Sequence, residues 1–364
     1  MKLVSFEVRT PFGPARRVGA VLDQGEIGRD SNIADLTTGY ALLLREGGAG
    51  RWRETAAAVL PPDMLEFLEG GQASMDAARQ TVEFARRFAG DPDYQVVFPR
   101  SEVRLLAPVP RPRTMRDFSE YEEHMSSRSG SQHKQPGFYH FACCYKGNPN
   151  MVFGPDDPIL WPDYTEKLDP ELEMACVVGK RGMNLTPEEA GDYIAGYLIF
   201  CDGSARDVQG KEYLGPYKAK DFGTNLGPCL VTPDEVGDEM NLRCSLKVNG
   251  ETWYEGNTGW RRNYTMPQLL AYASDSEELQ PGDVISAGTI GLSCSVDSGK
   301  WPQPGDVVEQ WIENIGAMVM RCERVPREVS YVRDGLPGLL PLPPGAEDFP
   351  QRLKDGTAEV RRPL

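Results

Sequence analysis

The sequence predicts a mixed α/β protein that is mostly β, with a small α+β domain at the N-terminal end. From Met115 onward, short apolar runs alternate with Gly, Pro, Asn and Asp, which is typical of closely spaced strands joined by tight turns. Before about residue 105, two strand patterns are followed by segments with helical spacing. We therefore expect a small N-terminal domain over 1–105, a larger β-rich domain over 106–325, and a Pro-rich extension over 326–364.

In the N-terminal domain, alternating apolar residues predict strands at Leu3–Val8 and Val18–Leu22. Apolar residues at three- and four-residue spacing predict helices within Arg51–Glu69 and Met75–Phe88. Three prolines in residues 105–114 indicate a connection to the next domain.

The larger domain is predicted to be a β barrel or sandwich with a few inserted helices. Asn249–Gly250 and two PGD segments supply the tight turns that such strands need. The polar stretch Met115–Ser127 has helical spacing, as do Pro187–Tyr193 and Met266–Ala273. The expected strands are Ile159–Trp161, Leu172–Val178, Ala195–Cys201, Leu242–Val248, Val284–Ala287 and Val307–Met320.

Charge and composition exclude several functions. The formal net charge of −15 argues against nucleic acid as a partner, because phosphate contacts need basic patches. No apolar run reaches about 18 residues, so we expect no membrane span, and the first residues lack the apolar block of a signal peptide. The eight cysteines show neither CxxC pairs nor zinc spacing, so we expect reduced thiols in a cytoplasmic protein.

Glu171 and Glu173 are the first candidates for chemistry. Because a strand has a period of two, both carboxylates should point to the same face where the strand enters the core. Two such anions need a cation between them, and hard oxygen ligands favour Mg²⁺, Mn²⁺ or Ca²⁺. Asp202, at the end of another apolar run, would add a third oxygen ligand. The alternative is a solvated strand end whose carboxylates pair with lysines.

The segment RDFSEYEEH offers a second group. If Phe118–His124 is helical, Asp117 and His124 lie about two turns apart on one face, with Tyr121 between them. A carboxylate that could complete a metal site and an imidazole that could activate water would then share one element. A solvated acidic helix with an incidental histidine is the alternative.

A donor-rich, glycine-rich stretch follows Asp202. It contains Arg206, Gln209, Tyr213 and Lys220 and would suit closure over an anionic substrate. An ordinary surface loop would have the same composition.

Taken in order, LDPELEM, DGSARDVQ, KDFGTNLGP, QPGDVISAGT and PGDVVE resemble the fumarylacetoacetate hydrolase family over roughly Arg113–Arg324. The resemblance implies a β-roll catalytic domain, usually in a homodimer. It also implies a Mg²⁺ (or Mn²⁺ or Ca²⁺) site formed by Asp117, Glu171, Glu173 and Asp202.

The same resemblance assigns roles to further residues. His124 matches the water-activating histidine, Glu309 its orienting carboxylate, and Lys220 a stabiliser of the oxyanion. The residues that match substrate-contacting positions are Tyr145, Arg206, Gln209, Tyr213 and Thr289.

These roles predict a metal-dependent hydrolase that cleaves a carbon–carbon bond in a small oxo-acid or 1,3-diketone. A lyase, such as a hydratase or decarboxylase, or an isomerase of the same family is the first alternative, and a catalytically silent binding protein is the second. Departures from the family pattern at Gly203, Ser119 and Cys143–Cys144 suggest an altered and roomier pocket.

Overall fold

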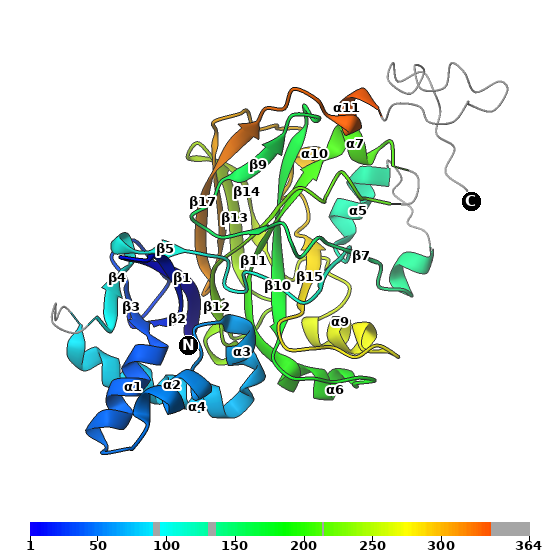
Figure 1. Cartoon of the computed structure of the whole chain (residues 1–364). Helices are drawn as coiled ribbons and strands as arrows, with labels where there is room; N and C mark the ends of the chain where they lie inside the picture. Colours follow the sequence, from blue (N-terminus) through cyan, green and yellow to red (C-terminus); the bar gives the residue numbers. More distant parts are fainter. Residues whose placement is uncertain (90–94, 130–135, 213–214, 336–364) are drawn as a thin grey trace, which may run out of the picture.

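The computed structural model describes residues 1–89, 95–129, 136–212 and 215–335 (Figure 1). Within them the chain is mixed α/β and mostly strand, as predicted. A 12-stranded sheet and a 5-stranded sheet form its framework.

The larger sheet has the order β4-β3-β2-β1-β12-β11-β10-β15-β6-β7. Its strands are β1 (Lys2–Thr10), β2 (Gly13–Val21), β3 (Asn32–Asp35), β4 (Val97–Pro99), β6 (Met115–Phe118), β7 (Cys144–Lys146), β10 (Leu168–Val178), β11 (Ile194–Ala205), β12 (Thr224–Val231) and β15 (Val284–Thr289). Two short strands are added at its side, β5 (Arg104–Leu105) on β1 and β8 (Val152–Phe153) on β12.

The smaller sheet has the order β14-β13-β16-β17-β9. Its strands are β9 (Ile159–Pro162), β13 (Arg243–Val248), β14 (Glu251–Asn257), β16 (Val307–Ile312) and β17 (Gly316–Val325). The predicted turn between β13 and β14 is present: Asn249 and Gly250 both have positive φ, as a two-residue hairpin of this type requires.

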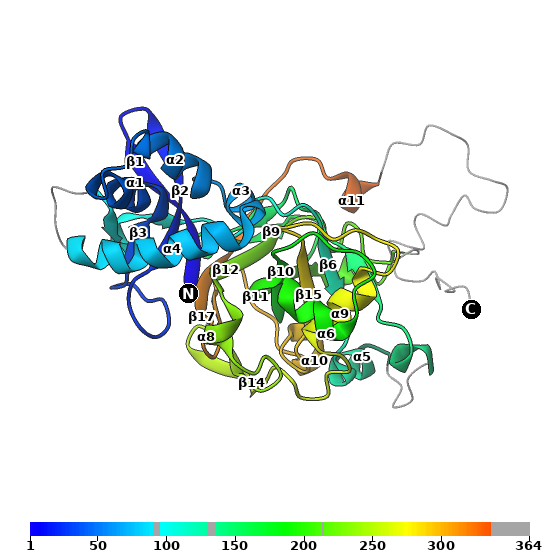
Figure 2. The ribbon, with the colours of Figure 1, turned by 90° about the horizontal axis from the view of Figure 1, so that it is seen from below.

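Four helices accompany the N-terminal strands and lie on the same side of the molecule in both views (Figures 1 and 2). They are α1 (Leu36–Glu46), α2 (Trp52–Val59), α3 (Met64–Glu69) and α4 (Gly71–Ala85). Strand β1 pairs with β12 through Lys2–Val231 and Leu3–Leu230, so the N-terminal strands continue the sheet of the larger domain.

The other helices are mostly short, and the sequence explains where two of them begin. Thr186 and Glu189 form a capping box at α6, and Thr265 and Gln268 form one at α9. The α-helices that follow the N-terminal four are α5 (Glu122–Ser129), α6 (Pro187–Ala190), α7 (Arg206–Gln209), α8 (Pro233–Val236), α9 (Met266–Ala273), α10 (Ser295–Ser298) and α11 (Tyr331–Asp334).

The prediction of a helix over Met115–Ser127 was only partly right. Residues Met115–Phe118 form β6, which pairs in parallel with β15, and helix α5 begins at Glu122. This strand is fixed by a partner 169 residues away in sequence (Met115 pairs with Val284), which local spacing does not reveal.

Strand β10 is buried on both faces, and its alternating residues divide between two cores. Leu172, Met174 and Cys176 join one apolar cluster, whereas Ala175 and Val177 join the other. Glu171 and Glu173 have the parity of Ala175 and Val177. Toward the N-terminal end of β10, the face that packs into the second apolar core therefore carries carboxylates in place of apolar side chains.

Candidate active site and metal centre

Three strands of the larger sheet each place a carboxylate at the end of the same apolar layer; β10 and β11 are neighbours, and β15 lies between β10 and β6. Asp117 follows Met115 on β6, Glu173 precedes Ala175 on β10, and Asp202 follows Phe200 on β11. The carboxylate oxygens of Asp117, Glu173 and Asp202 lie within 4.8 Å of one another, and all three residues are buried. Side chains two positions apart on a strand share a face, so the sequence period itself brings this cluster together.

This cluster has the properties of a site for a hard divalent cation. Asp117 Oδ1 and Asp202 Oδ1 are buried and have no hydrogen-bond partner among the described residues. Burial, followed by repulsion from the neighbouring carboxylates, raises the pKa of both Asp117 and Glu173 well above normal. Buried anions without enough donors are stable only when a cation or protons neutralise them, and an all-oxygen set suits Mg²⁺, Mn²⁺ or Ca²⁺. The residues therefore fit such an ion.

Glu171 faces cations instead. Arg206 and Lys220 both contact its carboxylate, and Lys220 also contacts Asp202. Burial would raise the pKa of Glu171, but Arg206 and Lys220 outweigh it and hold that pKa well below its usual value. Thr289 Oγ1 lies 2.6 Å from Glu171 Oε1 and 3.1 Å from Glu173 Oε1, so the two glutamates share one face as predicted.

Arg206 is fixed at the start of α7 by three groups. Its Nε donates to Asp169 Oδ2 at 2.7 Å, its Nη1 donates to Gln209 Oε1 at 2.9 Å, and its Nη2 contacts Glu171. Asp169 also accepts from the backbone N–H groups of Ser295 and Val296, which fixes the start of α10.

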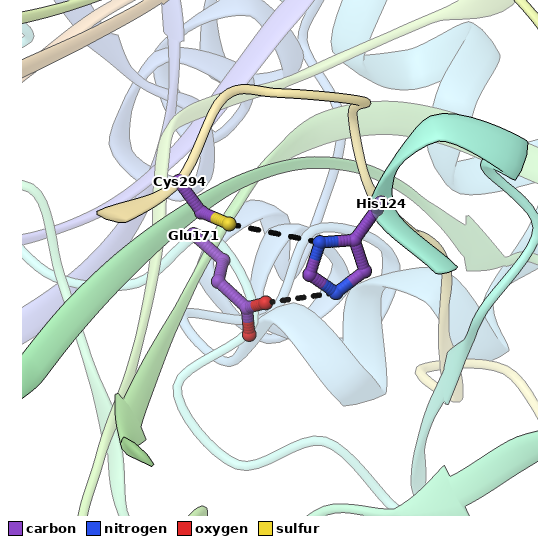
Figure 3. A group of neighbouring side chains, drawn as sticks. All are labelled: His124, Glu171 and Cys294. Atoms are coloured by element: carbon purple, nitrogen blue, oxygen red, sulfur yellow. Dashed lines mark hydrogen bonds and ion pairs between the residues drawn. The ribbon is translucent and has the colours of Figure 1, made fainter. Parts of the chain in front are cut away.

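His124 lies in the first turn of α5, against α10. Its Nδ1 is 2.8 Å from Asp297 Oδ2, and its Nε2 is 3.4 Å from Glu171 Oε1. Cys294 Sγ is 3.6 Å from Nδ1 (Figure 3). The imidazole is therefore held by one buried carboxylate while its other nitrogen faces the carboxylate cluster.

A cavity of about 200 Å³ opens onto these groups. This volume is below the range of about 300–1,000 Å³ common for drug-sized ligands, so it suits a small substrate. Seven of the residues predicted for the site line this cavity: Asp117, His124, Tyr145, Glu171, Gln209, Lys220 and Thr289. The rest of its lining is Phe118, Ser119, Cys143, Cys144 and Pro216. Tyr145 also donates from its hydroxyl to Asp202 Oδ2 at 2.7 Å.

The predicted pairing of His124 with Glu309 was wrong. Glu309 lies on β16 of the smaller sheet, where it pairs with Lys247 at 2.7 Å and remains partly exposed. Asp297 occupies the orienting position beside His124 instead.

Two other expectations need correction, and a third concerns a residue outside the described part of the chain. Asp117 and His124 both line the cavity, but they do so from a strand and a separate helix and not from one helical face. At Gly203 a Cβ atom would lie 2.8 Å from the Gly223 carbonyl oxygen and 3.0 Å from the Phe222 ring, so the missing side chain leaves no extra room there. Tyr213 lies outside the described residues.

Three residues of the site, Asp169, Asp297 and Cys294, are not predicted from the sequence. Asp169 belongs to the motif LDPELEM, two residues before Glu171. Its partners, Arg206 and the start of α10, are distant in sequence. Asp297 and Cys294 belong to the stretch after β15, which has no periodicity that singles them out.

The sequence matches the model of the fumarylacetoacetate (FAA) hydrolase C-terminal family over residues 113–323. The chain belongs to this family. Its members include hydrolases, isomerases and tautomerases, so the family is one of enzymes.

Among curated proteins, the chain is 33% identical over 322 residues to the mitochondrial oxaloacetate tautomerase FAHD2A of Bos taurus, covering 85% of this chain and 93% of that protein. It is 35% identical over 269 residues to the Homo sapiens FAHD2A, also described as a mitochondrial oxaloacetate tautomerase, covering 71% and 79% of the two chains.

Solved structures have the same fold. A fumarylacetoacetate hydrolase from Exiguobacterium antarcticum has a TM-score of 0.64 at 25% identity, covering 89% of this chain and all of that one. A maleylpyruvate hydrolase from Sphingobium sp. SYK-6, in complex with manganese(II) and pyruvate, has a TM-score of 0.61 at 24% identity, covering 89% and 99%. In the part of this chain that the structure describes, no helix has the length and apolar character needed to cross a membrane.

Proposed function

We propose that this chain is a divalent-cation-dependent enzyme that interconverts the enol and keto forms of a small 2-oxo acid of the oxaloacetate type. The observation that carries the proposal is the buried cluster of Asp117, Glu173 and Asp202 beside a small cavity that also contains His124. The tautomerase relatives, similar over most of this chain, support this reaction over others in the family.

The cation site is assigned to Asp117, Glu173 and Asp202, with Glu171 beside them. A cation held there would supply a Lewis acid toward the oxo and carboxylate oxygens of the substrate. Glu171 is already compensated by Arg206 and Lys220, so we assign it mainly to charge balance and to positioning His124.

His124 is the proposed proton carrier. When Nδ1–H donates a hydrogen bond to the Asp297 carboxylate, Nε2 has a lone pair that can take a proton from the carbon next to the substrate's carbonyl. The same nitrogen can return that proton to carbon when the reaction runs from enol to keto. Lys220, Tyr145, Gln209 and Thr289 are proposed to contact the substrate's oxygens.

Hydrolysis of a carbon–carbon bond is the second candidate. The contact between His124 and Asp297 favours it, because a base held by a carboxylate can also activate water. Both candidates use the same residues and differ in whether water takes part. The homodimer, the cytoplasmic location and the choice of Mg²⁺ over Mn²⁺ or Ca²⁺ stay predictions.

Measuring several products in parallel separates the candidates. Stopped-flow absorbance should show that the Mg²⁺-loaded enzyme speeds the decay of the oxaloacetate enol toward equilibrium, over a buffer blank, while total oxaloacetate stays constant. Release of a carboxylic acid from acylpyruvates would favour the hydrolase, and pyruvate formed from oxaloacetate would favour a decarboxylase. An enol decay rate equal to the blank, with and without Mg²⁺, would refute the tautomerase proposal.

A further inference from the structure

A second group of metal-binding atoms lies beside the carboxylate cluster. Ligand atoms of His124, Glu171 and Cys294 lie within 4.8 Å of one another, and all three residues are buried (Figure 3). This group offers nitrogen, oxygen and sulfur, whereas Asp117, Glu173 and Asp202 offer oxygen alone. The two groups therefore differ in the cations that they favour.

The orientation of His124 suits a metal ligand. Nδ1 of His124 lies 2.8 Å from Asp297 Oδ2, and its Nε2 lies 3.4 Å from Glu171 Oε1. When Nδ1 carries the proton of a neutral imidazole, the lone pair lies on Nε2, where a cation could bind it together with the Glu171 carboxylate. Metal-binding histidines commonly donate their other N–H to a carboxylate in this way.

Cys294 supplies the thiol. Its Sγ lies 3.6 Å from the His124 ring and 3.8 Å from Arg206 Nη2. A cation that binds there would displace the thiol proton, which leaves to solvent as the metal–sulfur bond forms. The positive charge of Arg206 opposes binding, but Asp169 and Glu171 both contact its guanidinium and compensate it.

We propose that His124, Cys294 and Glu171 form an inhibitory site for a thiophilic divalent cation such as Zn²⁺, next to the site that supports activity. Zinc prefers imidazole, thiolate and carboxylate ligands in a four-coordinate site, and two of the three residues here, His124 and Glu171, line the cavity. A cation at this site would occupy the nitrogen that carries protons in the proposed reaction. The inhibition therefore rests on the proposed function, whereas the binding does not.

Binding can be read without turnover. Co²⁺ added to the full-length, Mg²⁺-loaded protein should produce a sulfur-to-cobalt charge-transfer absorption, and Zn²⁺ should abolish it by competition. Cys294→Ala should remove this absorption. Cys229→Ala is the matched control, because Cys229 is also buried but its Sγ contacts the Ile315 carbonyl oxygen and not the cavity.

Inhibition provides the second measurement. At saturating Mg²⁺, the free Zn²⁺ concentration that halves enol decay should rise about 10-fold or more in Cys294→Ala and stay unchanged in Cys229→Ala. A wild-type protein that binds Co²⁺ without the thiolate absorption would overturn the proposal, even if Cys294→Ala failed to fold. Equal zinc inhibition in wild type and Cys294→Ala would also overturn it. Absence of turnover with the thiolate absorption present would refute the proposed function alone.

Discussion

Replacing Asp297 with asparagine tests how the carboxylate beside His124 acts. The two side chains are almost fully buried and their hydrogen bond is 2.8 Å long. A hydrogen bond to a charged group contributes about 1.5–3 kcal/mol. Since each 1.36 kcal/mol corresponds to a tenfold change in rate, Asp297→Asn should lower kcat by about 10- to 150-fold. The amide can donate to Nδ1, which would move the imidazole proton to Nε2 and remove the base.

The assay is the enol decay of oxaloacetate at saturating Mg²⁺, with metal affinity measured separately by calorimetry. KM and the Kd for Mg²⁺ should change little, because Asp297 is not among the residues that cluster with Asp117. Thermal unfolding would show whether the variant remains folded.

Two variants serve as controls for this prediction. Ser298→Ala lies on the same helix and removes a hydrogen bond to the Cys294 carbonyl oxygen without touching His124. Glu309→Gln removes a carboxylate that pairs with Lys247 on the other sheet. Both should keep kcat within about threefold of wild type. If Asp297→Asn retained more than a third of wild-type kcat, or if Glu309→Gln lost as much activity as Asp297→Asn, the assigned orientation of His124 would be wrong.

Four further predictions concern metal, stability and thiols. Exhaustive chelation should abolish turnover, and Mg²⁺ or Mn²⁺ should restore it. Asp202→Asn should raise the metal concentration that half-maximal activity needs, as measured by titrating activity with metal. Full activity in metal-free protein would contradict this prediction. Arg206→Met should lower the free energy of unfolding in urea by about 3–5 kcal/mol, because it leaves Asp169 buried without its cationic partner and Glu171 with Lys220 as its remaining cationic contact among those described above; a loss below about 1 kcal/mol would show that Lys220 and the α10 backbone compensate them. Burial raises the pKa of Glu120 to about 7, above the ordinary value of 4.5. The folded state therefore binds this proton more tightly than the unfolded state, and the free energy of unfolding should fall as pH rises from 4.5 to about 7. Urea unfolding of Glu120→Gln should show a flatter pH dependence and higher stability at pH 8. Thiol titration should find two reactive cysteines in the native protein and eight after denaturation without reductant, whereas six or fewer after denaturation would indicate a disulfide.

The sequence predicted those parts of the site that local periodicity controls. Glu171 and Glu173 share a face because they are two residues apart on a strand, and Asp202 lies opposite Glu171 because β10 and β11 are antiparallel neighbours. The apolar flanks of these residues made β10 and β11 predictable. In the smaller sheet, the pair Asn249–Gly250 made the turn between β13 and β14 predictable.

Features that depend on distant pairing could not be predicted in this way. Asp117 is on a strand because β6 pairs with β15, and nothing within four residues of it shows that partner. The partner of His124 depends on how α10 folds back onto β10 through Asp169, so neither Asp297 nor the exclusion of Glu309 follows from spacing. The family resemblance correctly implied a carboxylate beside His124, but it assigned that carboxylate to Glu309 and not to Asp297.

The pairing of β1 with β12 has a consequence for how the molecule can be divided. A boundary near residue 105 separates two regions of sequence, yet one ladder of backbone hydrogen bonds crosses it. A fragment starting at residue 106 would leave Leu230 and Val231 of β12 without their backbone partners on β1, and unpaired strand edges readily recruit other chains. Removing the N-terminal region should therefore favour self-association of the remaining fragment.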